Sequence, residues 1–367
     1  MTKSKKIILI LGVLALFGIS IWLFGGKDKS ADTTTGVNSK KIKIGFIAPL
    51  TGERKSYGQA VRDGVILAKK DLGADNIEVF FEDTQCDPIL ATNAMDKLVK
   101  IINVKAVIGD ICSGATLAAA PLANQNKIVL ISPGSTSPEI TSAGEYIFRT
   151  IQSDAFQGKF GADLVYQNGG RRLAIIYTDE SYGQGFQIIL SSYFKGNIVS
   201  IQRIDQDGGD IRVQLLKLKT TNPDTIYIVT NGSRIGGGVI KQIRDIGITA
   251  KLYGSEGLKG DDLFDLAGDA AEGLIVTSIS FGTDALQKRF LKEYDSLPGI
   301  FVAQGYDAFT ALYEAVKAGA STGEEIKNEF ARIKFSGVSG DIIFDSNGDV
   351  QSDYSIYEVQ GRAFILQ

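Results

Sequence analysis

The stretch "IKIGFIAPLTGERKSYGQ", residues 42–59, joins an apolar strand pattern to the start of a helix. The same order returns later, where the strand pattern "LAIIYT" at 173–178 is followed by "SYGQ" at 181–184. In both copies the serine and the glutamine three positions later form a capping-box pattern, which marks the first turn of a helix. A four-residue match can arise by chance, but the shared context favours two similar lobes.

From residue 41 onward, strand and helix patterns alternate along the chain. Continuous apolar strands such as "KIVLIS" at 127–132 are typical of parallel sheets that are covered by helices on both faces. The sequence therefore predicts an α/β fold, in which ligands bind beyond the carboxyl ends of the strands. The predicted strands are 42–48, 77–82, 105–109, 127–132, 172–177, 197–203, 225–229, 251–254 and 273–278. The predicted helices are 57–72, 89–102, 114–124, 155–168, 182–194, 209–219, 236–247, 284–295, 303–318 and 323–333.

The N-terminal segment, residues 1–26, resembles a membrane anchor. Three lysines precede an uncharged run at 7–24, which has the minimum length for a membrane-spanning helix. A cleaved signal peptide has the same layout, but the A-x-A pattern of a cleavage site is missing. The polar residues 27–40 predict a flexible linker. The remainder is then expected outside the cytoplasm, where disulfides are permitted.

Composition weighs against several classes of enzyme. The 367 residues include no histidine, so a Ser-His-Asp or Cys-His site is excluded within this chain. The net charge is −3 and no basic run lies outside the N-terminus, which argues against a nucleic-acid partner. The glycine-rich "NGSRIGGGV" at 231–239 lacks the residues of a phosphate loop, and "DSNGDV" at 345–350 predicts a hairpin turn, not a calcium loop. We expect a binding protein without metal or cofactor.

Two cysteines, Cys86 and Cys112, each follow a predicted strand. A catalytic thiol needs a base or a positive neighbour, and "DICSGAT" around Cys112 offers neither. Without histidine, a zinc site would have to be built from the two cysteines and carboxylates, which is unusual. Because neighbouring strands bring their ends together, we expect a disulfide between them.

Hydroxyl and acidic side chains follow other strand ends. Ser113 stands at a helix start, where free N–H groups favour an anion, and "ISPGSTSPEIT" at 131–141 adds Ser135 and Thr136. Glu256 in "YGSEGL" follows a strand of the second lobe, between small residues that leave it exposed to a cleft. Together they suit a zwitterion, with the carboxylate on the hydroxyls and the ammonium on Glu256. Helix capping by Ser113, a simple turn at 131–141 and a solvated Glu256 are the alternatives.

Seven motifs occur in the order found in branched-chain amino-acid-binding proteins, which the chain resembles over about residues 41–360. They are "IGFIAPLTG", "SYGQ", "CDP", "IGDICSGAT", "LISPGSTSPEIT", "YGQG" and "GSEGL". The resemblance implies a type I periplasmic solute-binding protein of an ABC transporter, with two Rossmann-like lobes joined by three hinge crossings. The implied lobes are 41–152 with 281–348, and 153–280 with 349–367.

The resemblance also assigns roles to individual residues. It implies the Cys86–Cys112 disulfide and places a ligand carboxylate on Ser113 and Thr136. The ammonium group of the ligand would lie near Glu256 and Tyr182, and the side chain of the ligand would lie near Tyr57. Backbone groups of Gly134 and Ser135 would complete the site. The sequence pattern alone allows two interpretations: Tyr57 and Tyr182 face each other across one cleft, or each tyrosine packs on its own lobe.

One departure concerns residues 233 and 234. Leucine binders tend to carry an aromatic residue after the "GG" motif, where this chain has Ser233 and Arg234. Arg234 would favour a polar or acidic ligand side chain, or would point to solvent. The functional hypothesis is capture of an amino acid and delivery to a transporter permease. A sensory receptor ectodomain of the same fold and a two-lobed glycosyltransferase-like enzyme are the alternatives.

Overall fold

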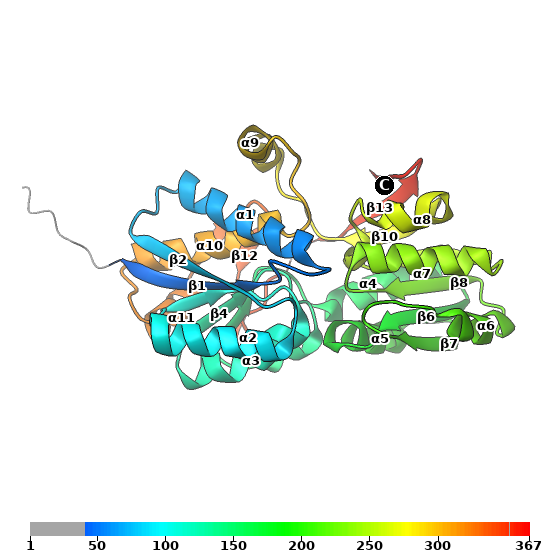
Figure 1. Ribbon diagram of the computed structural model, residues 1–367, viewed down its shortest axis with the longest axis horizontal. Coiled ribbons are helices and arrows are strands. Elements are labelled where there is room, and N and C mark those ends of the chain that lie inside the picture. The colour runs from blue at the N-terminus through cyan, green and yellow to red at the C-terminus, as the bar shows by residue number, and fades with distance from the viewer. Residues whose placement is uncertain (1–40, 352) are drawn as a thin grey trace, which may run out of the picture. The chain divides into compact units, whose positions relative to one another are not determined.

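The computed structural model describes residues 41–351 and 353–367 (Figure 1). The first sheet is parallel and has the order β2-β1-β3-β4-β5. Its strands are β1 (Ile42–Ala48), β2 (Ile77–Asp83), β3 (Ala106–Ile108), β4 (Val129–Ser132) and β5 (Ile147–Arg149). The helices beside it are α1 (Lys55–Asp71), α2 (Pro88–Lys97, extended by a π-helical turn Leu98–Ile102), α3 (Ser113–Gln125), α10 (Val302–Lys317) and α11 (Gly323–Phe330).

The second sheet has the order β14-β13-β10-β9-β8-β6-β7. Its parallel strands are β6 (Arg172–Thr178), β7 (Asn197–Ile204), β8 (Thr225–Val229), β9 (Lys251–Gly254) and β10 (Ile275–Ser278). The strands β13 (Ser355–Gln360) and β14 (Ala363–Leu366) extend it with antiparallel pairing. Its helices are α4 (Asp154–Gln167), α5 (Ser181–Tyr193), α6 (Arg212–Thr220), α7 (Ser233–Asp245) and α8 (Leu263–Ala267).

Apolar clusters lie on both faces of each sheet, which explains the continuous apolar strands. Helices α1 and α10 lie on one face of the first sheet, and α2 and α3 lie on the other (Figure 1). In β4, Val129 and Ile131 belong to one apolar cluster with residues of α1 and α10, whereas Leu130 belongs to another with residues of α2 and α3. The second sheet is divided in the same way between α6, α7 and α8 on one face and α4 and α5 on the other. A strand with helices on both faces cannot alternate polar and apolar residues.

The chain passes between the two sheets three times: after β5, after β10, and between β12 (Asp341–Ile343) and β13. Helix α9 (Asp284–Tyr294) follows the second passage, and β11 (Lys334–Ser336) pairs with β12 in a small antiparallel ribbon. The predicted α/β fold of two Rossmann-like lobes with three crossings is therefore confirmed.

Every strand and helix predicted from the sequence is present, with ends that differ by a few residues. The short strand β5, the ribbon β11–β12 and the antiparallel edge β13–β14 were missed. The second sheet is therefore mixed, not parallel throughout. Strands β5, β11 and β12 span only three residues each, and β13 and β14 are largely exposed or half-buried at the edge of the sheet, so none is marked by a long buried apolar run. The turn at 345–350 connects strands that do not pair, so the expectation of a hairpin there was wrong.

The repeated "SYGQ" does not form capping boxes, which corrects the prediction. Helix α1 begins before Ser56, helix α5 begins at Ser181 itself, and neither cap residue makes a side-chain cap hydrogen bond. The glycine explains the repeat instead. A Cβ on Gly58 would lie 2.0 Å from the Pro49 carbonyl oxygen, and one on Gly183 would lie 2.2 Å from the Thr178 carbonyl oxygen. Both helices therefore start in close contact with the end of the preceding strand, which only glycine permits.

None of the helices within 41–351 and 353–367 is long and apolar enough to cross a membrane. The predicted anchor at 1–26 and the linker at 27–40 lie outside the described residues.

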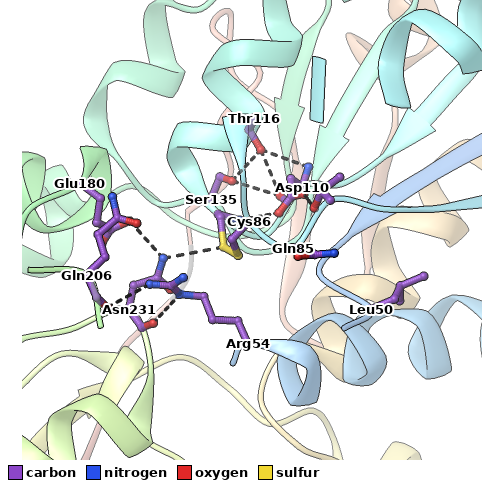
Figure 2. Close-up of a disulfide and its surroundings, with 12 residues drawn as sticks. Leu50, Arg54, Gln85, Cys86, Asp110, Thr116, Ser135, Glu180, Gln206 and Asn231 are labelled. Atoms are coloured by element: carbon purple, nitrogen blue, oxygen red, sulfur yellow. Dashed lines mark hydrogen bonds between the residues drawn. A yellow bond between two sulfur atoms is a disulfide. The ribbon is translucent and has the colours of Figure 1, made fainter. Parts of the chain in front are cut away.

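The Cys86–Cys112 disulfide is present, with the two Cα atoms 5.5 Å apart (Figure 2). The reason differs from the one expected, because β2 and β3 are not neighbours and β1 lies between them. The bond instead joins the loops that leave the carboxyl ends of these two strands.

We predict that reducing this disulfide lowers the free energy of unfolding by about 3–4 kcal/mol. The bond joins residues that are 26 positions apart and so closes a loop. In the unfolded chain this closed loop has less conformational entropy, which stabilises the folded state. Urea unfolding with and without dithiothreitol measures the effect. The double variant Cys86→Ser, Cys112→Ser is the control, since dithiothreitol should leave its midpoint unchanged. Equal midpoints for the oxidised and reduced protein would contradict the prediction.

Candidate ligand-binding site

A small cavity of about 20 Å³ is lined by residues from the carboxyl ends of strands in both sheets. Six of the seven predicted ligand-binding residues lie in its wall. They are Tyr57, Ser113, Gly134, Thr136, Tyr182 and Glu256. The sequence did not single out the other four lining residues, which are Ile111, Asn231, Gly257 and Phe301. Ile111, Asn231 and Gly257 lie within motifs quoted above but were not picked out individually, and Phe301 is the residue just before α10.

Hydroxyl and backbone groups form one side of the cavity. Ser113 is the first residue of α3 and Cys112 is the cap residue, so the alternative that Ser113 caps the helix was wrong. The Ser113 hydroxyl accepts a hydrogen bond from the backbone N–H of Ser137 at 3.2 Å, which ties α3 to the loop that carries Thr136. Gly134 is required, because a Cβ there would lie 2.7 Å from the Ile111 Cβ. An anion in the cavity would meet the positive end of α3 at this side.

Ser135 does not line the cavity, unlike its neighbours. Its hydroxyl donates to the Asp110 carbonyl oxygen at 3.0 Å and lies 2.8 Å from the Thr116 hydroxyl (Figure 2). Its backbone N–H donates to the Ser132 hydroxyl at 2.9 Å. Both polar groups of Ser135 are therefore engaged within the first sheet, where they shape the loop and leave no donor for a ligand.

Arg149, at the end of β5, holds the same loop from behind and was missed by the sequence reasoning. It is fully buried, and its Nη1 donates to the carbonyl oxygens of Thr136 and Ser137 at 3.2 and 3.0 Å. Its Nε and Nη2 donate to the two carboxylate oxygens of Asp349 at 2.6 and 2.8 Å. A bidentate pair of this kind is both strong and directional. Because Asp349 is 200 residues away from Arg149 along the chain, no local sequence motif predicts the pair.

Glu256 forms the opposite, acidic side of the cavity. It begins a 3₁₀ turn, Glu256–Leu258, directly after β9. Its side chain is buried from solvent and lines the cavity, so Glu256 faces the cleft as expected, and the alternative of a solvated carboxylate was wrong. Burial raises the pKa of Glu256 to about 7, because the charged form loses its hydration. Tyr182 packs beside it and donates a hydrogen bond to the Ser255 hydroxyl at 2.6 Å.

Two contacts connect the wall of the cavity across the two sheets. The Tyr57 hydroxyl accepts a hydrogen bond from the Ser233 N–H at 2.9 Å and lies 3.2 Å from the Gly257 carbonyl oxygen. Arg54, just before α1, donates from Nε to the Asn231 carbonyl oxygen at 2.8 Å (Figure 2). Tyr57 therefore reaches beyond its own sheet, as the cleft interpretation predicted.

Asn231 and Arg234 show how the "NGSR" segment is used. The Asn231 amide nitrogen donates to the Glu180 carboxylate at 3.1 Å and lies 3.7 Å from the Cys112 sulfur (Figure 2). Arg234 instead forms an exposed ion pair with Asp265 at 3.3 Å, outside the cavity. The interpretation in which Arg234 selects an acidic ligand side chain thus has no support, and the alternative that it points to solvent fits.

The fold and this site place the chain among two-lobed solute-binding proteins, and comparison with known proteins agrees. Residues 41–363 match the family model "Periplasmic binding protein", so the chain belongs to this family of solute-binding proteins. The "Leucine-, isoleucine-, valine-, threonine-, and alanine-binding protein" of Pseudomonas aeruginosa is 27% identical over 354 residues, covering 91% of this chain and 92% of the relative. The resemblance to branched-chain amino-acid-binding proteins is therefore confirmed.

Solved structures show the same fold with different ligands. A branched-chain amino acid transporter substrate-binding protein from Streptococcus pneumoniae, in complex with isoleucine, matches with a TM-score of 0.81 and 26% identity. The match covers 89% of this chain and 99% of that one. A solute-binding protein of an ABC transporter from Rhodopseudomonas palustris, in complex with 3,4-dihydroxybenzoic acid, matches with a TM-score of 0.79 and 25% identity, covering 89% and 96%. The fold alone therefore does not distinguish an amino acid from an aromatic acid.

Proposed function

We propose that this protein captures an α-amino acid outside the cytoplasm and delivers it to an ABC transporter permease. The observation that carries the proposal is the buried carboxylate of Glu256, which faces the same cavity as the start of α3. The ligand carboxylate would lie at Ser113 and the helix N-terminus, and the ammonium at Glu256. A zwitterion neutralises both ends of the cavity at once.

Glu256 also favours an amine-bearing ligand over an aromatic acid. A benzoate carries no cation, so its binding would leave a desolvated carboxylate without a partner and add a second negative charge. Burying an unpaired charge is costly, and protein sites avoid it by pairing or protonation. The cavity therefore suits an amino acid better than the dihydroxybenzoic acid bound by the Rhodopseudomonas protein.

Closure of two lobes about a hinge supplies the mechanism. The lobes in this proposal are 41–152 with 281–349, and 153–280 with 350–367, which moves the last boundary expected from the sequence by one residue. We place the last crossing after Asp349, because its carboxylate is bound to Arg149 of the first sheet. A ligand held by Ser113 on one lobe and Glu256 on the other binds best when the lobes are closed, so it shifts the population toward closure.

The N-terminal segment would keep the protein at the membrane in this proposal. The uncharged run at 7–24 follows three lysines, which orient such a segment with its N-terminus in the cytoplasm. The binding lobes would then face the outside, near the permease.

Isothermal titration calorimetry with a panel of natural L-amino acids and 3,4-dihydroxybenzoate tests the function. We expect at least one amino acid to bind with a Kd of about 10 μM or tighter, which corresponds to about 7 kcal/mol. We expect no heat from the aromatic acid. A folded protein that binds no amino acid would refute the proposal, and binding of the aromatic acid alone would assign a different ligand class.

A further inference from the structure

Two buried carboxylates lie in and behind the cavity wall: Glu256 lines the cavity, and the backbone N–H of Asp154 donates to the carbonyl oxygen of Thr136, another lining residue, at 2.8 Å. Three of their four carboxylate oxygens have no hydrogen-bond partner among the described residues. Asp154, the first residue of α4, is fully buried, and neither of its carboxylate oxygens has a partner among the described residues. The Oε2 atom of Glu256 also has none. Buried carboxylates without donors are rare, because each ionised group loses its hydration and gains nothing in return.

Among the described residues, no cation near Asp154 is free to pair with it. The nearby cation is Arg149, whose guanidinium already donates to Asp349, to the Thr141 hydroxyl at 2.6 Å and to carbonyl oxygens of the 135–137 loop. Gln157, one turn along α4, directs its amide N–H groups to Thr277 at 3.1 Å. The remaining titratable groups that face Asp154 are acids or phenols: Glu256, Glu180, Tyr182, Tyr227 and Tyr354.

This environment disfavours two negative charges at once. Burial raises the pKa of Asp154 well above its ordinary value, and the negative charge of Glu256 raises it further. The nearby Thr136 hydroxyl, which does not meet the geometry of a hydrogen bond to Asp154, and the positive charge of Arg149 oppose the shift. Glu256 has a pKa raised by burial to about 7. When two acids interact in this way, their protons belong to the pair and leave in separate steps.

We propose that Asp154 is protonated in the empty site and releases its proton to solvent when the ammonium group of an amino acid binds at Glu256. The inference rests on the proposed function. The ligand remains an intact ammonium ion, and the proton leaves the Asp154 carboxyl group, so one cation replaces another in the site. The ammonium cancels the repulsion from Glu256, which removes one reason for Asp154 to stay neutral. Asp154 is thus a positioning residue that acts through Glu256 and determines how many protons are released when the ligand binds.

The pH dependence follows from this exchange. As pH falls, Glu256 is also protonated in the empty protein, so the ligand must displace more protons. The Kd therefore rises as pH falls through the value of about 7 for Glu256. The rise approaches about tenfold per pH unit for each proton displaced. Above pH 7, Glu256 is already ionised in the empty protein, so the protons released on binding come from Asp154 alone.

Titration calorimetry at pH 8 in two buffers of different ionisation enthalpy counts the protons released. The probes are L-alanine and L-leucine, both named for the Pseudomonas relative. We expect release of about one proton per ligand from the unaltered protein, and of less than about a fifth of that from Asp154→Asn. Asp163→Asn is the matched control, because Asp163 lies on the surface of the same helix and pairs with Lys195. This variant should release as many protons as the unaltered protein.

The outcomes separate the two proposals. If an amino acid binds and no proton is released at pH 8, the inference fails while the proposed function stands. Equal release from Asp154→Asn and the unaltered protein would exclude Asp154 as the source. If neither probe nor any other amino acid binds, the proposed function itself fails. Should Asp154→Asn not fold, the Kd of the unaltered protein between pH 6 and 9 decides: a Kd constant with pH overturns the exchange.

Discussion

Replacing Glu256 by alanine is expected to abolish measurable amino-acid binding while the protein stays folded. The ammonium of the ligand would be buried in the closed cavity with its anionic partner removed. Truncating one member of a desolvated charge pair costs about 2–5 kcal/mol, which corresponds to a loss of about 30-fold to several-thousand-fold in affinity. The same calorimetric panel measures the loss, and circular dichroism with thermal unfolding checks the fold.

The fold should survive because Glu256 contributes little to stability. Its Oε2 atom has no partner within the described residues, and burial disfavours its charge. The isosteric Glu256→Gln is a second variant that keeps the volume and removes only the charge. Glu139→Ala is the control, since Glu139 lies outside the cavity wall. Affinity of Glu256→Ala within about threefold of the unaltered protein, which is less than 1 kcal/mol, would show that Glu256 does not hold the ligand.

Replacing Arg149 by methionine is expected to cost about 3–5 kcal/mol of unfolding free energy. The change leaves Asp349 buried with an uncompensated charge, and that loss is far larger than the net value of an intact pair. The carbonyl oxygens of the 135–137 loop also lose their donor. We expect weaker ligand binding as well, because the loop that carries Thr136 is then held only from one side.

Urea unfolding of the empty protein measures this stability effect. The matched control is Lys241→Met, which breaks an ion pair with Asp245 in which both side chains are more than half exposed. Exposed pairs contribute about 0–1 kcal/mol, so the control should unfold close to the unaltered protein. An Arg149→Met protein as stable as the Lys241→Met protein would contradict the assigned role of the buried pair.

The candidate site was predictable to a large extent because parallel strands place their carboxyl ends together. Ser113, Thr136 and Glu256 each follow a strand that its apolar sequence predicts. The strand order of the fold then places the three residues around one cavity. The order of seven motifs then pointed to a known family. Ser135 lies outside the cavity wall because adjacent residues of a loop can face opposite directions, and only the hydrogen bonds to Asp110 and Thr116 determine which way its side chain faces.

Apart from the short helix α8 and the short or edge strands β5 and β11–β14, the sequence by itself determined the helices and strands and which strand ends carry polar side chains, since these depend on periodicity over short windows. Only the tertiary structure decided that Arg149 pairs with Asp349, that Glu256 is buried, and that Asp154 stands beside it without a donor. Each of these depends on segments that meet only in the fold. The charge state of a carboxylate depends on its hydration and its neighbours, and neither is encoded by the residues next to it in the chain.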